Sequence, residues 1–103
     1  MIKENDIQEI LFCVAKCKEQ VSRGLVIEIL QGSHSVRVFN RRLNQNSAFG
    51  SMKGWSTEEL DGVILEMMEM GLVAETEDEY PRLTLTEAGR EMLHSTRGDI
   101  DAG

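Results

Sequence analysis

Four cationic side chains lie in a stretch of the chain that contains no acid. Residues 33–54 carry them, namely Arg37, Arg41, Arg42 and Lys53. Arg37 and Arg41 are four residues apart, so a helix would present both guanidinium groups on one face, along one phosphate path. This spacing predicts binding to a phosphate backbone. The alternative is that the four groups only solvate a loop in an otherwise acidic protein.

The helix predicted after this stretch offers a second way to bind phosphate. Ser56 and Glu59 have the spacing of a capping box, which places a helix start at Thr57. The free backbone amides of a first helical turn, here those of Thr57 and Glu58, favour an anion. Because Lys53 immediately precedes this helix, we expect the cations and the amides to converge on one surface.

The charge reverses after this point. Residues 55–79 contain nine acids and no base, and the formal net charge of the chain is −7. A negative molecule repels polyphosphate at long range, so binding must depend on a local basic patch. If all four cations met phosphates, the logarithm of affinity would fall with the logarithm of salt with a slope of roughly −3 to −4. We expect little sequence specificity, because acids on the third main helix would face an electronegative groove.

The acidic helix suggests a different kind of interface. Gly62 lies inside it, and Leu65 is expected to be exposed beside Gly62 among carboxylates that include Glu69. A small residue next to an apolar one permits close approach of another surface, so this face is a candidate for binding a basic protein or domain. The alternative is a solvated helix face.

Hydrophobic periodicity and capping signals predict the elements that position these residues. The expected helices span residues 6–20, 23–31, 57–71 and 87–95, with a short helical turn after Ser33, a loop at 44–54, and strands at 72–76 and 82–85. The expected N-caps are Asn5, Ser22, Ser33, Ser56 and Thr86, with Gln8 completing a capping box at the first of them. The order predicts an α+β fold, a winged helix: a helix-turn-helix with a short β-hairpin wing.

Length and composition allow one core. A chain of 103 residues with 41% hydrophobic content is expected to form a single domain over residues 1–95 with a flexible tail at 96–103. No apolar run is long enough to cross a bilayer, and no signal-peptide core is present, so we expect a cytoplasmic protein, associated with the nucleoid if it is bacterial, with no membrane partner.

The cysteines and histidines do not form a predicted metal site. Cys13 and Cys17 are four residues apart on one helical face and would supply at most two of the usual four zinc ligands. Buried thiols are therefore expected. His34 is expected in a loop and His94 at a helix end, neither with a ligand-spaced neighbour. The sequence indicates no metal and no cofactor.

Several short motifs occur in one order along residues 5–95 and together resemble the RQC domain, the winged helix at the C-terminus of RecQ-family DNA helicases. The motifs are Gln31-Gly32-Ser33, Phe49-Gly50, Met52-Lys53, and Glu79-Tyr80-Pro81-Arg82-Leu83-Thr84-Leu85-Thr86-Glu87-Ala88-Gly89. No single motif is diagnostic, and the collinear spacing carries the resemblance.

The resemblance implies a module that grips duplex DNA near a junction through backbone contacts. Ser33, Arg37 and Lys53 occupy the positions of phosphate contacts, and the wing, with Tyr80 and Arg82, would help to part the strands. Departures from the family pattern are Gln31 in place of the leading arginine, the absence of bases from the third helix, and an acidic wing tip. Beside a proline, Tyr80 is expected to pack on the sheet more readily than to act as a wedge.

Catalysis has little support in the sequence. The chain lacks a glycine-rich phosphate loop followed by Lys-Ser or Lys-Thr, so a helicase motor would have to be another chain or domain. The leading hypothesis is a non-enzymatic DNA-binding accessory module of a RecQ-like helicase system, acting in DNA repair, recombination or replication. The alternative is a protein-interaction adaptor that has lost most of its DNA affinity. A small transcription regulator is disfavoured because its reading helix would be acidic.

Overall fold

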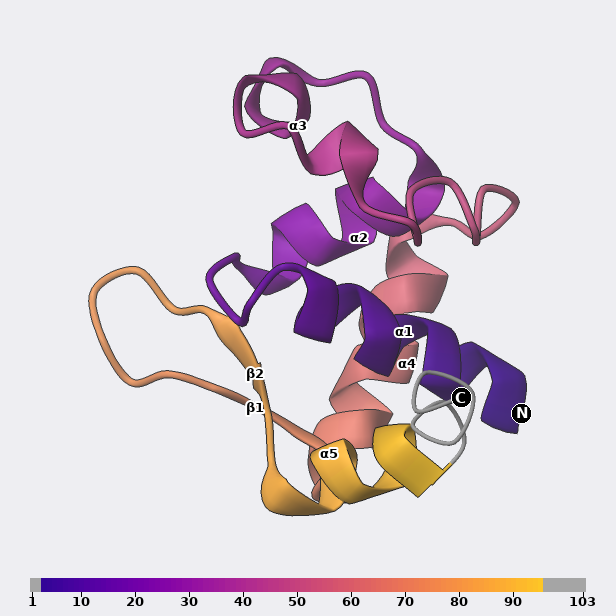
Figure 1. Ribbon diagram of the computed structural model, residues 1–103, viewed down its shortest axis with the longest axis vertical. Coiled ribbons are helices and arrows are strands. Elements are labelled where there is room, and N and C mark those ends of the chain that lie inside the picture. The colour runs from indigo at the N-terminus through magenta and orange to yellow at the C-terminus, as the bar shows by residue number, and fades with distance from the viewer. Residues whose placement is uncertain (1–2, 96–103) are drawn as a thin grey trace.

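A computed structural model describes residues 3–95 of the chain. The elements are α1 (Glu4–Lys16), α2 (Arg23–Gln31), α3 (Val36–Asn40), a 3-10 turn η1 (Leu43–Gln45), α4 (Thr57–Glu69), β1 (Val73–Glu75), β2 (Leu83–Leu85) and α5 (Glu87–Leu93). In Figure 1, α1 crosses the centre of the molecule, α3 lies at one end and the hairpin loop projects to one side. The order confirms the predicted α+β winged helix.

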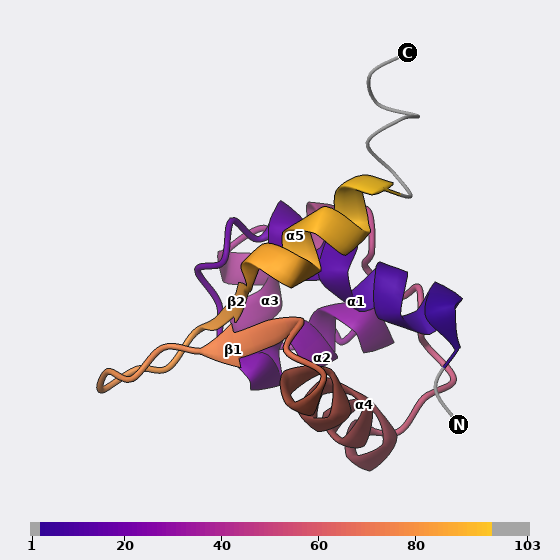
Figure 2. The ribbon, with the colours of Figure 1, turned by 90° about the horizontal axis from the view of Figure 1, so that it is seen from below.

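The apolar faces of the helices meet in one core. Helix α1 packs against α2, α5 and β2, and α2 packs against α4. Figure 2 shows α4 along its axis, beside α2. The largest fully buried side chains come mainly from α1, α2, α4 and β2 and include Ile10, Leu11, Ile29, Leu30, Leu60, Ile64 and Leu83. Each fully buried leucine or isoleucine contributes about 1.5 to 3 kcal/mol to the hydrophobic driving force, so this core fixes the relative placement of the helices.

The wing is a two-stranded antiparallel sheet of the predicted kind. Val73 pairs with Leu85 and Glu75 with Leu83. The strands are shorter by a residue or two than predicted because residues 76–82 form a closed loop: the Thr76 amide donates to the Arg82 carbonyl, and the Arg82 amide donates to the Thr76 hydroxyl. This projecting loop is fixed to a rigid base.

Three helix starts match their predictions. Ser22 caps α2, Thr86 caps α5, and Ser56 with Glu59 forms the complete capping box of α4. Gly32 ends α2 in the left-handed conformation, at φ 72°. Its Cα lies against the backbone of Gly50, since an added Cβ would be 3.1 Å from the Gly50 Cα. Local sequence therefore specified these boundaries.

The first helix was predicted wrongly at both ends. Its N-cap is Lys3, which makes no side-chain cap hydrogen bond, and not Asn5. Gln8 instead donates to the Met92 carbonyl across the core. The helix ends at Lys16, four residues earlier than expected, because Lys18 and Glu19 take left-handed φ values of 56° each and turn the chain back toward α2.

The short third helix also differs from its prediction. Ser35, and not Ser33, caps it, and the buried residue is Val38. Two other apolar residues of this helix, Val36 and Phe39, are 73% and 42% exposed. The predicted loop 44–54 is held on α2 by two backbone hydrogen bonds, from Gly50 to the Ile29 carbonyl and from Met52 to the Leu30 carbonyl. This anchoring buries the Met52 side chain.

The cysteines are free and buried, as expected. Among residues 3–95, no cluster of three or more potential metal-binding side chains occurs. Within the same range, no helix has both the length and the apolar character needed to cross a membrane. The predicted tail at 96–103 lies outside the described residues, and the division of the chain at residue 95 stays a prediction.

Candidate nucleic-acid interface

The predicted cations do not meet on one surface. Arg37 and Arg41 line a cleft of about 550 Å³ between α2, α3 and the wing. Arg41 also lines a second cleft, together with Arg42. Lys53 lies elsewhere, beside Trp55 and Glu59 at the start of α4. The four cations, which are close together in the sequence, are thus distributed over three places on the surface by the folding of the loop.

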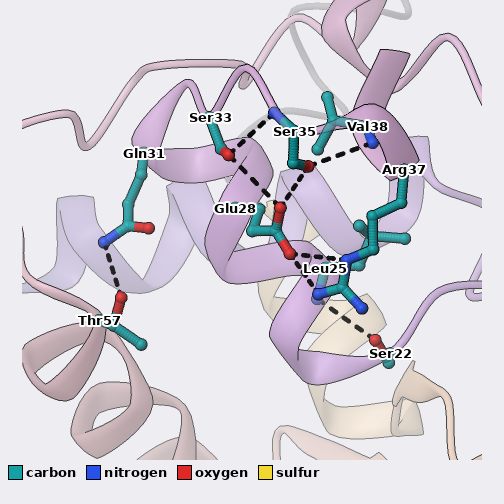
Figure 3. A network of polar contacts seen from close by, with 9 residues as sticks. All are labelled: Ser22, Leu25, Glu28, Gln31, Ser33, Ser35, Arg37, Val38 and Thr57. Carbon is teal, nitrogen blue, oxygen red and sulfur yellow. Dashed lines mark hydrogen bonds and ion pairs between the residues drawn. The ribbon is translucent and has the colours of Figure 1, made fainter. Parts of the chain in front are cut away.

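Arg37 is engaged by a carboxylate within the molecule. Its guanidinium forms an ion pair with Glu28 on α2, which also accepts hydrogen bonds from Ser33 and Ser35, as Figure 3 shows. Burial opposes ionisation of this carboxyl, but the hydrogen bonds from Ser35 and Arg37 outweigh it and lower the pKa of Glu28. The network fixes the turn between α2 and α3.

This network changes the roles expected for two residues. The Ser33 hydroxyl donates to Glu28 and accepts from the Ser35 amide, so it helps to shape the turn. Arg37 remains 58% exposed at its side chain while paired. A guanidinium has five N–H donors, so Arg37 retains donors that can reach a phosphate, although with its charge partly neutralised.

The start of α4 is the predicted anion site, and it is partly occupied by protein groups. Glu59 accepts a hydrogen bond from the Ser56 amide at 2.9 Å, and Ser56 accepts from the Glu59 amide at 3.0 Å. Gln31 donates to the Trp55 carbonyl, and it also donates to the Thr57 hydroxyl (Figure 3), so it joins α2 to this turn. Lys53 is exposed beside these groups. The glutamine that replaces the family arginine therefore has a structural contact here.

Tyr80 does not pack on the sheet, contrary to the prediction, because 78% of its surface is exposed. It lines the same cleft as Arg37 and Arg41, from the opposite wall. Arg82, the other predicted wing residue, forms an ion pair with Asp78 at 3.0 Å that closes the loop. The wing thus presents an exposed aromatic ring next to two arginines of α3 and its C-terminal end.

The acidic side of α4 is exposed as predicted. Leu65 is 44% exposed, and Gly62 has no neighbouring atom within 4 Å of where a Cβ would lie. Glu69 is exposed, but Asp61 pairs with Arg23 at 3.2 Å and is only half-exposed. Met70, which the sequence did not single out, is 56% exposed at the end of the same helix.

Two lysines missed in the sequence lie near the predicted cations. Lys16 and Lys18 line the second cleft with Arg41 and Arg42. The sequence did not indicate this proximity, because the first helix was predicted to continue to residue 20, which would keep both lysines away from residues 41–47. The early end of α1 brings them to it. Asn46 completes this junction, since its side chain donates to the Cys13 carbonyl and to the Cys17 sulfur.

Comparison with known proteins agrees with this architecture. The family model described as the RQC domain matches residues 4–99. The ATP-dependent DNA helicase RecQ of Bacillus subtilis is 24% identical over 88 residues, and that of Haemophilus influenzae is 27% identical over 89 residues. Each match covers 85% of this chain but only 15% and 14% of the respective helicase, so the chain spans a small part of their length. The chain belongs to the RQC domain family.

Proposed function

We propose that this chain is a DNA-binding accessory module that works with a RecQ-type helicase motor and has no catalytic activity of its own. The observation that carries the proposal is the exposed Tyr80 on the wing, which shares a cleft with Arg37 and Arg41 in a chain of the RQC family. An exposed aromatic ring can stack on a base, and arginines can bind the adjacent phosphates.

Duplex DNA would bind to the turn after α2 and to the start of α4. We assign four residues to this contact: Ser33, Lys53, Ser56 and Thr57. They lie near the end of α2 or the start of α4, which the hydrogen bonds of Gln31 join. These groups bind phosphate and sugar without reading bases, and α4 directs carboxylates outward. Binding is therefore expected to be weak near physiological salt and nearly independent of sequence.

Fluorescence anisotropy with the full chain tests this proposal. Blunt and forked duplexes of two unrelated sequences are titrated at about 50 mM and about 200 mM salt. We expect binding at the lower salt, similar affinity for both sequences, and a loss of roughly tenfold or more at the higher salt. No binding at about 50 mM salt contradicts the proposal.

The wing role has a separate readout. Replacing Tyr80 by Ala should reduce the fluorescence rise of 2-aminopurine placed at the duplex terminus by at least half, because base–aromatic stacking contributes about 1–3 kcal/mol per base. Val36→Ala, a control at another exposed apolar residue, should leave the signal unchanged. Equal signals from Tyr80→Ala and the unmodified chain argue against a wedge.

A second candidate function is supported by the exposure of Leu65 and Met70 on the acidic face of α4. This face would bind a basic protein surface, such as one on a helicase motor domain. Leu65→Glu should weaken capture of a purified RecQ-type motor domain at least fivefold, while Val36→Glu on α3 should not. Unchanged capture by Leu65→Glu removes this candidate.

A further inference from the structure

The cleft between the end of α1 and the segment after α3 is strongly cationic. Lys16, Lys18, Arg41 and Arg42 line it, and its remaining lining residues include no acid. Its volume is about 640 Å³. Within residues 3–95, none of the ion pairs involves these four side chains. By contrast, the wing cleft contains Asp78 and Glu79.

Two of the four cations, Arg41 and Lys16, make contacts other than ion pairs. Arg41 donates to the Gln20 carbonyl at 3.3 Å, and the Lys16 ammonium lies 5.4 Å from the centre of the Phe12 ring. Glu19, the adjacent acid, is directed elsewhere: its carboxylate accepts from the Leu85 amide and from Arg90. The positive charges therefore have no counterion within the described structure, although the whole molecule is acidic.

The backbone at this cleft is strained. Lys18 and Arg42 both take left-handed φ values, 56° and 58°, a conformation that non-glycine residues rarely adopt. These two positions come from segments far apart in sequence, and both side chains line the same cleft. Like charges gathered in one cleft repel one another unless an anion binds between them.

The wing cleft and the cationic cleft adjoin each other at Arg41, which lines both. We call the series of side chains from Tyr80 through Arg41 to Arg42, Lys18 and Lys16 the path. Asn46 and Ser47 add uncharged polar groups at the far end, and no aromatic side chain lines that end. The path combines a ring for one base at its entrance with cations for the phosphates that follow, which is the composition expected for a single strand.

We propose that this path binds single-stranded DNA that leaves the duplex at the wing, with the cationic cleft holding its backbone independently of sequence. The proposal rests on the proposed function and adds a second contact to it, separate from Ser33, Lys53 and the start of α4. A single strand suits this cleft better than a duplex does. The cleft offers four cations for one phosphate backbone, where two chain segments meet, and it has no helix or hairpin that could enter the groove of a duplex.

The test compares a blunt duplex with the same duplex carrying a single-stranded extension of about ten thymidines, on either the 3′ or the 5′ strand, by anisotropy at about 50 mM salt. The full chain should bind one extended duplex about tenfold more tightly than the blunt one. Neutralising two of the cations by Lys18→Gln with Arg42→Gln should abolish most of this gain and leave blunt-duplex affinity within twofold. Lys53→Gln, the matched control, should weaken blunt binding and preserve the gain.

The outcomes separate the two proposals. Binding of the blunt duplex without any gain from either extension overturns the single-strand path and leaves the proposed function standing. An equal gain in the double variant also overturns the path. Loss of blunt-duplex affinity in that variant would assign the cleft to duplex contact instead. Thermal unfolding of the double variant checks that it folds.

A second measurement decides the case in which no duplex binds. Amide chemical shifts of the full chain are followed by NMR as a ten-residue thymidine oligonucleotide is added. Shifts of Gln45, Asn46 and Ser47 that saturate support the path, and they should disappear when Lys16→Gln is added to the double variant. Shifts confined to other regions overturn it. Equal shifts with anionic lipid vesicles or inorganic polyphosphate would show a general polyanion site and overturn the assignment to a nucleic acid strand.

Discussion

The turn region at residues 33–54 and the helix and wing region at 55–79 carry opposite charges, and in each region part of that charge is engaged in contacts within the molecule. In the first, Arg37 pairs with Glu28. In the second, Glu59 caps its own helix, Asp61 pairs with Arg23, and Asp78 pairs with Arg82. The difference lies in what remains. In the turn region, Arg41, Arg42 and Lys53 make none of the ion pairs found within residues 3–95, whereas on α4 exposed carboxylates accompany the exposed Leu65. The charge of a sequence segment therefore does not by itself predict the charge of a surface.

The two regions also differ in how they are held. The turn region has little regular structure and depends on a few contacts with α2, above all the approach of Gly50 to Gly32 and the Glu28 network. Helix α4 is fixed by its capping box and by four buried apolar residues. We expect mutations in the turn region to act through tertiary contacts and mutations on α4 to follow intrinsic helix propensity.

A Gly→Ala substitution where α2 meets the turn region and another on α4 should give the largest effects, with opposite signs. Gly32→Ala should lower the free energy of unfolding by about 2 kcal/mol, because alanine disfavours the left-handed conformation and its Cβ would crowd Gly50. Gly62→Ala should raise it by about 1 kcal/mol, because that position is helical, open and without contacts. Urea unfolding measures both. Two effects of the same sign would contradict the expected difference between the turn region, which depends on tertiary contacts, and α4, which follows helix propensity.

Removing the anchor of the turn region should have the next largest effect. Glu28→Gln should cost about 1–3 kcal/mol, because charge-assisted hydrogen bonds from Ser35 and Arg37 are lost. The pKa of Glu28 is lowered in the folded state, so its contribution is present above the ordinary pKa of a glutamate and is lost as the pH falls through the folded pKa.

Unfolding curves measured between pH 7 and pH 3 should therefore fall less steeply for Glu28→Gln than for the unmodified chain. The same variant releases Arg37, so its DNA affinity at about 50 mM salt should be equal or higher, provided that the turn remains folded. Glu66→Gln, at an exposed acid of α4, is the control and should change stability by less than about 0.5 kcal/mol. An unchanged pH profile would mean that the network adds no stability.

The smallest effect is expected at Lys53. Lys53→Gln should leave stability within about 0.5 kcal/mol, because the side chain is exposed and makes none of the ion pairs found within residues 3–95. It should remove about one phosphate contact from duplex binding. The slope of the logarithm of affinity against the logarithm of salt should therefore become less steep by roughly 0.9. Anisotropy at several salt concentrations measures this slope. An unchanged slope would remove Lys53 from the duplex contact.

The sequence by itself determined the elements whose signals are local. A capping box needs only Ser56 and Glu59, a left-handed helix end needs Gly32, and alternating apolar residues define the strands around the wing. These depend on groups within a few residues of one another, so the order of elements, the fold class and the exposure of Leu65 followed without knowledge of distant contacts.

Only the tertiary structure decided the rest. The end of α1 at Lys16, the choice of Ser35 over Ser33 as a cap, and the exposure of Tyr80 depend on groups remote in sequence or on a loop closed by its own side chains. The partner of Arg37 is nine residues away on another helix, and the cationic cleft joins residues more than twenty positions apart. The sequence lists the charges, but their electrostatic effect depends on distance in space, which packing of the core sets.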